Sequence, residues 1–166
     1  DVLLAAKLFD AEFTRKWTNA PYLVRNDTGH LLSEADFRDD GRVDTWLVWD
    51  EHKKFPVNCA AGGVSPALFG SFAVRLLNGK TIQCRPALQL LKEAAAEFTP
   101  EISEKTTTIP ADEVRKAVRL FATEKPSCYC TWVGLEQDRD AMQTNRAVCM
   151  FYGLTGQFDQ RGSNVL

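Results

Sequence analysis

The sequence contains few of the features that would identify a chemistry directly. Its 166 residues include two histidines and two methionines, and no apolar run approaches the roughly 20 residues that a membrane-spanning helix needs. The net charge at pH 7 is −2, which gives no electrostatic reason to expect binding to nucleic acid or to an anionic membrane. We therefore expect a globular chain with no nucleic-acid partner and no direct membrane insertion.

Catalytic and metal-binding motifs are also scarce. The chain has no G-x-G-x-x-G, P-loop or G-x-S-x-G pattern, and its five cysteines fit no disulfide framework. Cys128 and Cys130 form a C-x-C pair, but no second pair or nearby histidine completes a zinc site. We therefore predict no metal ligand and no catalytic residue, and we interpret the cysteines as small buried residues in a reduced setting. His30, His52 and the acidic pair Asp50-Glu51 are interpreted as turn or solvated surface residues.

The first half of the sequence alternates between apolar and polar stretches. Phe9, Phe13 and Trp17 recur at helical spacing, which predicts one helix over 3–17. A short extended segment follows at 22–24. A polar excursion over 25–66 contains one apolar, β-favouring run at 45–49 that predicts a strand.

The most specific local pattern spans residues 70–85. Two alternating runs, FAVRLL and KTIQCR, flank Asn78-Gly79, a pair that suits a type I′ turn, and together they predict a β-hairpin. Three helices are predicted: from Pro86 to about Phe98, from Pro110 to Lys125, and from about Asp138 to Tyr152. Pro100 is expected to end the first of them. A buried strand is predicted at 128–133. This alternation predicts a single α/β domain over 1–166, with αβα layers of the Rossmann-like kind and an inserted β-hairpin.

The predicted strand–glycine–helix junction is the first candidate site. Ligands in open α/β sheets lie beyond the carboxyl ends of strands, where Gly134 would let a backbone approach closely and the next helix would favour an anion. Glu136 and Gln137 would then project into the crevice and hydrogen-bond a heterocycle. One glycine is weak evidence, and an ordinary strand-to-helix turn is the alternative.

The glycine-punctuated tail is the second candidate site. Gly153, Gly156, Gly162 and Asn164 could permit sharp turns and close approach to a ligand. The alternative is that Gly153 or Gly156 simply ends the preceding helix.

Several segments, taken in order, resemble catalytic subunits of the molybdopterin oxidoreductase (dimethyl sulfoxide reductase-like) superfamily. The runs IPADEVRKAVRLFATEKP, CYCTWVGLEQ and RAVCMFYGLTGQFDQRG resemble that family's helix, strand and "LTGN…G" loop. LFDAEFTRKWTNAPYLV and NGKTIQCRPALQLLKEAAAEFTPE resemble earlier family segments. The resemblance covers nearly the whole chain and implies a domain of the formate dehydrogenase type.

The resemblance implies a cofactor and residues that bind it. The parent enzyme would hold molybdenum or tungsten between pyranopterin guanine dinucleotides and carry out two-electron oxygen-atom or hydride-equivalent transfer. Cofactor-binding roles are implied for Gly134, Glu136, Gln137, Gly156 and Gly162, with Gln157 in place of the family's usual asparagine. Cys128 and Cys130 match no family ligand.

The family's remaining parts are missing from this sequence. They are the cysteine cluster for an iron–sulfur centre, the segment with the metal ligand, and the carboxy-terminal barrel. We therefore expect an internal fragment that is inactive alone, and its expected partners are an electron-transfer subunit together with the remaining domains of the parent chain. The compartment, cytoplasmic or periplasmic, is left open. The rival interpretations are a non-catalytic nucleotide-binding module and a structural interaction domain.

Overall fold

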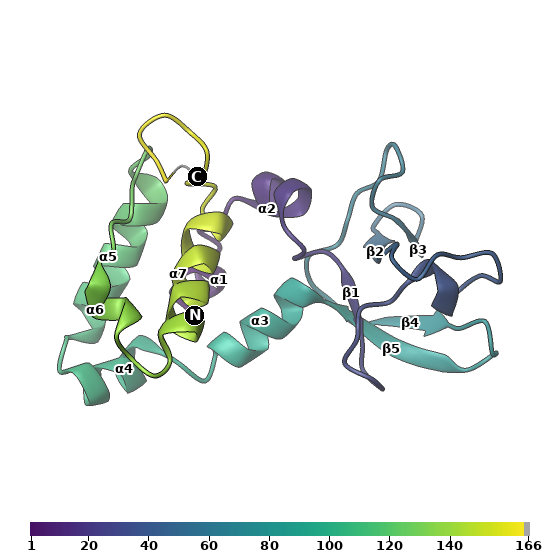
Figure 1. The fold of residues 1–166 in the computed structure, drawn as a ribbon, viewed down its shortest axis with the longest axis horizontal. Coiled ribbons are helices and arrows are strands. Elements are labelled where there is room, and N and C mark those ends of the chain that lie inside the picture. Colours follow the sequence, from purple (N-terminus) through teal and green to yellow (C-terminus); the bar gives the residue numbers. More distant parts are fainter. Residues whose placement is uncertain (165–166) are drawn as a thin grey trace. The chain divides into compact units, whose positions relative to one another are not determined.

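The computed structural model describes residues 1–164 and divides the chain into two compact units. Unit 2 comprises residues 17–94, and unit 1 combines residues 1–16 with 95–166. Unit 2 carries all the strands, whereas unit 1 is built from helices and loops (Figure 1). The chain is therefore a mixed α/β protein, as predicted.

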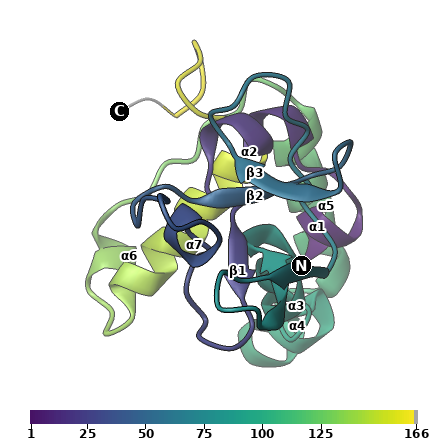
Figure 2. The ribbon, with the colours of Figure 1, turned by 90° about the vertical axis from the view of Figure 1, so that its right-hand side faces the viewer.

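Unit 2 contains two small antiparallel sheets. Strands β1 (Leu23–Arg25), β5 (Thr81–Pro86) and β4 (Phe72–Arg75) form one sheet in the order β1-β5-β4. Strands β2 (Leu47–Asp50) and β3 (Phe55–Asn58) pair separately (Figure 2), and their register places Val48 opposite Val57. Because these sheets have three and two antiparallel strands, they do not confirm the predicted Rossmann-like layering.

The predicted hairpin is present as β4 and β5, with Val74 opposite Ile82. Its turn differs from the predicted type I′, which needs positive φ at both central residues. Only Gly79 has positive φ, at +83°, and its amide donates to the carbonyl of Leu76. This matches a three-residue loop in which a type I turn is followed by one left-handed glycine.

One apolar cluster forms the core of unit 2. Its members come from β1, β2, β4, β5 and the loops between them, and all are under 7% exposed. They are Leu23, Leu32, Leu47, Val74, Leu76, Ile82 and Cys84. The ring of Trp49 stacks on Phe72 at 4.4 Å between centroids and closes the cluster at one edge. The alternating burial along β5 thus places one face of the hairpin in the core.

The predicted helix over 3–17 is wrong, because the chain breaks it into α1 (Val2–Ala5) and α2 (Ala11–Trp17). Lys7 adopts a left-handed conformation with φ of 54°, which ends α1. Asp10 then starts α2, since its Oδ1 accepts a hydrogen bond from the Phe13 amide at 2.9 Å. An aspartate placed there caps the second helix better than it would fit within a continuous one.

The second half of the chain is mostly helical. After α3 (Ala87–Ala95), Pro100 begins α4 (Pro100–Thr107) instead of merely ending the previous helix. Thr99 caps α4 through its hydroxyl, and proline suits the first helical turn because its missing amide is not needed there. The helix α5 (Ala111–Thr123) follows, and the predicted final helix is α7 (Ala141–Leu154). No helix within residues 1–164 is both long and apolar enough to cross a bilayer.

Candidate functional site

The predicted strand at 128–133 is absent, so Gly134 does not follow a strand. Residues 128–132 lie outside helices and strands, and Gly134 lies inside the short helix α6 (Val133–Glu136). A strand needs a hydrogen-bonded neighbour, and within residues 1–164 none lies beside this segment. Trp132 is 81% exposed, which contradicts the predicted burial of the segment.

The junction around Gly134 is nevertheless open. A Cβ atom placed on Gly134 would meet nothing within 4 Å, and Glu136 and Gln137 are both exposed. The helix α7 begins only at Ala141, after Asp138 and Asp140. No helix therefore starts immediately after Gly134, where the anion site was predicted, and the two carboxylates add negative charge before α7, although Asp140 makes no side-chain cap hydrogen bond.

Gly156 ends α7 through a specific backbone motif. Its φ is +69°, its amide donates to the Gly153 carbonyl, and the Gln157 amide donates to the Tyr152 carbonyl. These two bonds are those of a Schellman cap, which favours glycine at this position. A side chain at Gly156 would also come within 2.9 Å of the Asp10 carboxylate. The helix-cap alternative is therefore correct for Gly156, while Gly153 lies within the helix.

Gln157 is completely buried and joins two segments distant in sequence. Its Oε1 accepts a hydrogen bond from the Ser127 amide at 3.0 Å, and its Nε2 donates to the Phe121 carbonyl at 3.2 Å. Both ends of the carboxamide are thus paired with backbone. The sequence had marked this position only as a departure from the family's asparagine.

Lys125 adds a second link between the same segments. Its ammonium donates to the carbonyl of Thr155 at 2.7 Å and lies 3.7 Å from the Asp10 carboxylate. A lysine near the end of a helix favourably satisfies carbonyls that have no intrahelical partner. The start of the glycine loop is therefore held by residues from three parts of unit 1.

The rest of the loop packs against residues 126–129. Gly162 has φ of +87°, and a Cβ there would come within 2.9 Å of the Pro126 ring. The Asn164 side chain accepts from the Tyr129 amide at 2.9 Å and donates to the Tyr129 carbonyl at 2.8 Å. Gly162 thus allows close approach to another segment of this chain.

The five predicted cofactor-binding residues therefore fall into two groups. Gly156 and Gly162 share the loop after α7, whereas Gly134, Glu136 and Gln137 precede that helix. The two groups lie toward opposite ends of α7 (Figure 1). A helix of 14 residues is about 21 Å long at 1.5 Å per residue, so the groups do not form a single small pocket.

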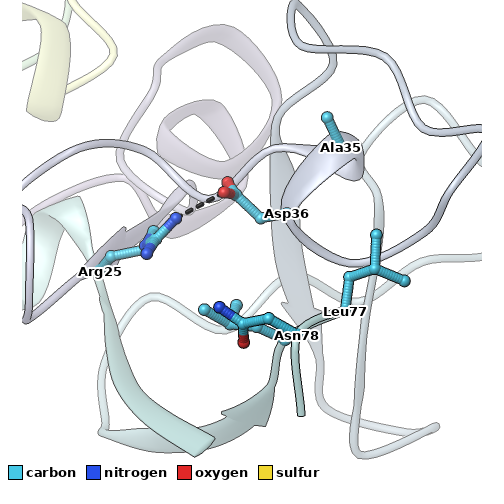
Figure 3. A pocket seen from close by; sticks show the side chains of 6 residues that line it. Arg25, Ala35, Asp36, Leu77 and Asn78 are labelled. Atoms are coloured by element: carbon cyan, nitrogen blue, oxygen red, sulfur yellow. Dashed lines mark hydrogen bonds and ion pairs between the residues drawn. The ribbon is translucent and has the colours of Figure 1, made fainter. Parts of the chain in front are cut away.

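Unit 2 contains a cavity of about 320 Å³ beside an internal ion pair. Arg25 donates to Asp36 at 2.5 Å (Figure 3). It also binds Asp27 through two nitrogens, at 3.1 Å each. The hydrogen bond from Arg25 lowers the pKa of Asp27 to about 2. Because Arg25 is already matched by two carboxylates, we interpret this cluster as structural.

The prediction that Asp50 is a solvated surface residue is wrong. Its side chain is fully buried, and its Oδ1 accepts hydrogen bonds from the amides of His52 at 2.9 Å and Lys53 at 3.5 Å. The bond from His52 holds the pKa of Asp50 below its ordinary value. The buried carboxylate therefore organises the β2–β3 turn, a role comparable to an Asx turn. Its neighbour Glu51 and His52 are exposed.

The cysteines are also less buried than predicted. Cys84 is buried in the core of unit 2, and this burial raises the pKa of its thiol to about 11. Cys128, Cys130 and Cys149 are instead exposed, because the strand expected to bury the first two does not form. Across residues 1–164, no three histidine, cysteine or acidic side chains lie close enough together to hold a metal ion.

Comparisons with known proteins identify relatives along nearly the whole chain, although no protein-family model matches it. The alpha subunit of perchlorate reductase from Dechloromonas aromatica is 31% identical over 99% of this chain and 21% of the relative. The alpha subunit of dimethylsulfide dehydrogenase from Rhodovulum sulfidophilum is 28% identical over 98% of this chain and 18% of the relative. A sulfite dehydrogenase subunit from Allochromatium vinosum is 31% identical over 96% and 19%. The chain spans about a fifth of the length of these curated relatives.

Proposed function

Because the homologues of this chain over nearly its whole length are molybdopterin oxidoreductase catalytic subunits of the dimethyl sulfoxide reductase family, we propose that it is a segment of such a subunit. The observation that carries this proposal is the extent of the match, 99% of the chain against 21% of perchlorate reductase alpha. The intact subunit would catalyse two-electron chemistry, with oxygen-atom or hydride-equivalent transfer at molybdenum or tungsten. We expect no activity from this segment alone.

Within that subunit, we assign the segment to the region around a pyranopterin guanine dinucleotide. The open backbone at Gly134 and the exposed Glu136 and Gln137 support contact with a polar heterocycle. A carboxylate accepts and a carboxamide both donates and accepts hydrogen bonds, which suits the edge of a guanine base. Asp138 and Asp140 disfavour a phosphate at the start of α7, so the base is the better match for this junction.

The glycine loop would contribute by its shape. Gly156 and Gly162, as the pattern of internal contacts indicates, let the loop turn back and pack tightly on residues 126–129. Gln157 and Lys125 are occupied by bonds within the chain, so their side chains are not available to a cofactor without breaking those bonds. We therefore propose that the loop offers backbone groups to the cofactor, while its side chains hold it in place. Metal ligands and any iron–sulfur cluster would come from outside this segment.

The apolar surface of unit 1 supports packing against further protein. Eight large apolar side chains in its helices and connecting segments are between 43% and 81% exposed. They are Phe98, Ile102, Ile109, Leu120, Trp132, Val133, Met142 and Met150. Contiguous exposed apolar patches mark surfaces that other protein covers, and we propose that these side chains contribute to such a surface. The remaining domains of the parent subunit are the occupants we propose, and a further partner would be a separate electron-transfer subunit.

The same surface favours one rival function, that of a non-catalytic interaction or nucleotide-binding domain. Both functions require a partner surface, so exposure does not separate them. The cofactor content of the complete gene product does separate the two functions. Only the oxidoreductase proposal requires that the complete gene product carry molybdenum or tungsten.

The test is therefore to express the complete gene product and measure its metal by mass spectrometry and the guanine nucleotide released by acid. We expect molybdenum or tungsten together with guanine nucleotide, and neither in the 166-residue chain expressed alone. A folded complete product without either metal would refute the oxidoreductase function.

A matched pair of glutamines tests the junction. Gln137→Ala in the complete product should lower the retained guanine nucleotide several-fold, because one hydrogen-bonding side chain is lost. Gln143→Ala removes an equally exposed glutamine from α7 and should leave the nucleotide content unchanged. Equal retention in both variants would remove Gln137 from the cofactor site.

A further inference from the structure

Two exposed thiols lie side by side next to the glycine loop. The Sγ atoms of Cys128 and Cys130 are 4.0 Å apart, and both side chains are exposed. A disulfide needs the two sulfurs at about 2.05 Å, so from this starting distance they must approach each other by about 2 Å. Neither thiol is used in the proposed cofactor site.

We propose that Cys128 and Cys130 form a redox-active dithiol that exchanges with low-molecular-weight disulfides, such as oxidised glutathione, and that Asn164 opposes its closure. This proposal does not depend on the cofactor assignment. It concerns a pair of residues for which the family resemblance implies no ligand role.

The reaction proceeds by two thiol–disulfide exchanges. The Cys130 thiolate attacks one sulfur of oxidised glutathione, a Cys130–glutathione bond forms, and the first glutathione thiolate leaves. Cys128 then attacks the Cys130 sulfur, the Cys128–Cys130 bond forms, and the second glutathione leaves. Two cysteine thiols lose two electrons and two protons, and one glutathione disulfide becomes two glutathione thiols.

The order of attack follows from the contact between the sulfurs. The hydrogen bond with Cys130 raises the pKa of the Cys128 thiol, which makes Cys128 the less reactive thiol of the reduced pair. Once Cys130 is bonded to glutathione, that contact with a free thiol is gone. Cys128 is therefore suited to the second, intramolecular step.

The residue between the two cysteines is held by the glycine loop. The Asn164 carboxamide bonds both the amide and the carbonyl of Tyr129, at 2.9 Å and 2.8 Å. Within one residue, these two groups point to the same side when the backbone is extended, as in a hydrogen-bonded strand pair. Asn164 thus replaces a neighbouring strand at Tyr129 and favours an extended backbone there.

An extended backbone opposes the disulfide. At about 3.3 Å per residue, the Cα atoms of Cys128 and Cys130 would be about 6.6 Å apart, close to the upper limit of about 6.8 Å for a disulfide. Closing the bond favours a shorter separation, so it competes with the two hydrogen bonds from Asn164. We therefore expect a disulfide that is easily reduced, and an oxidised state in which the loop is less firmly held.

The test is peptide mapping of the complete gene product after equilibration in a glutathione redox buffer and blocking of free thiols. Trypsin yields peptide 120–139, which contains Cys128 and Cys130, and peptide 147–161, which contains only Cys149. We expect peptide 120–139 to lose two hydrogens, while the exposed single thiol in 147–161 carries glutathione. Cys128→Ser should trap glutathione on Cys130.

Two asparagine variants test the opposition by Asn164. Asn164→Ala should shift the dithiol–disulfide equilibrium about tenfold toward the disulfide, because two opposing hydrogen bonds are removed. Asn145→Ala removes a side-chain bond inside α7, to Ala141, and should cause no shift. The dithiol is refuted if peptide 147–161 becomes modified while peptide 120–139, under the same conditions, forms no disulfide. In that outcome peptide 120–139 either stays reduced or carries glutathione without closing the bond. An equal equilibrium in Asn164→Ala and wild type refutes the opposition by Asn164.

Discussion

The two units of this chain differ in the kinds of side chain that they bury. Unit 2 gathers leucine, valine and isoleucine side chains from several strands into one buried cluster. Unit 1 leaves eight large apolar side chains exposed, against four in unit 2, and buries the polar residues Thr155, Gln157 and Ser163 beside apolar ones such as Leu4 and Leu154. The comparison teaches that unit 2 has one apolar core gathered from several strands, whereas unit 1 relies more on buried, hydrogen-bonded polar side chains.

The largest expected effect distinguishes the apolar core from the uncovered surface. Leu23→Ala should lower the free energy of unfolding by about 2–5 kcal/mol, because Leu23 is fully buried in the unit 2 cluster. Leu120→Ala, at a position 61% exposed in unit 1, should change it by less than about 0.5 kcal/mol. Urea unfolding of both variants measures this difference, and equal losses would contradict the comparison.

The next effect tests the hydrogen bonds of unit 1. Gln157→Ala should cost about 1–3 kcal/mol, since it leaves the Ser127 amide and the Phe121 carbonyl without their partner. Gln160→Ala serves as the control, because it removes one bond from an exposed residue, to the Gly156 carbonyl. Thermal unfolding of the two variants should separate them clearly. A Gln157→Ala protein as stable as wild type would show that these bonds do not support the loop.

A smaller effect concerns a strained residue between α4 and α5. Thr108 adopts φ of +63°, a conformation that glycine tolerates and a β-branched residue does not favour. Thr108→Gly should therefore stabilise the chain by about 1 kcal/mol. Thr106→Gly, inside α4, should destabilise it by about 0.3 kcal/mol, because glycine costs about 1 kcal/mol in a helix relative to alanine and threonine already costs about 0.7. Denaturant midpoints measure both changes, and the same sign for both would contradict the assignment.

The smallest effect is a pH dependence of unit 2. Arg25 lowers the pKa of Asp27 from 3.8 to about 2 in the folded chain, so ionised Asp27 favours folding. That contribution is complete above about pH 4 and is lost as the pH falls toward 2. Asp27→Asn should flatten the stability profile in that window, whereas Asp40→Asn, at an exposed pair with Arg38, should not. Parallel profiles of wild type and Asp27→Asn would contradict the ion pair.

Elements defined by local chemistry were predicted well. The hairpin at 72–86 and the helices α5 and α7 follow from turn residues, proline and periodic apolar positions, all of which act over a few residues. The break between α1 and α2 was missed, although Asp10 was visible as a capping residue. The apolar residues at helical spacing suggested one continuous helix, but the cap at Asp10 starts a second helix.

The strand predicted at 128–133 failed for a different reason. Its composition favours a strand, but a strand exists only when another pairs with it. None does so within residues 1–164, and Trp132 is left exposed. The burial of Asp50 and Gln157 was equally invisible, because their partners are backbone groups that the fold brings to them.

The amino-acid order by itself determined the local elements and the resemblance to molybdopterin oxidoreductases, because turns, caps and family motifs each depend on residues that are neighbours in the sequence. Only the tertiary structure decided that Gly162 makes room for Pro126, that Gln157 is buried, and that Cys128 and Cys130 are exposed. Those outcomes depend on contacts between segments 30 or more residues apart, such as Gln157 with Ser127, and no local pattern encodes which segments will meet.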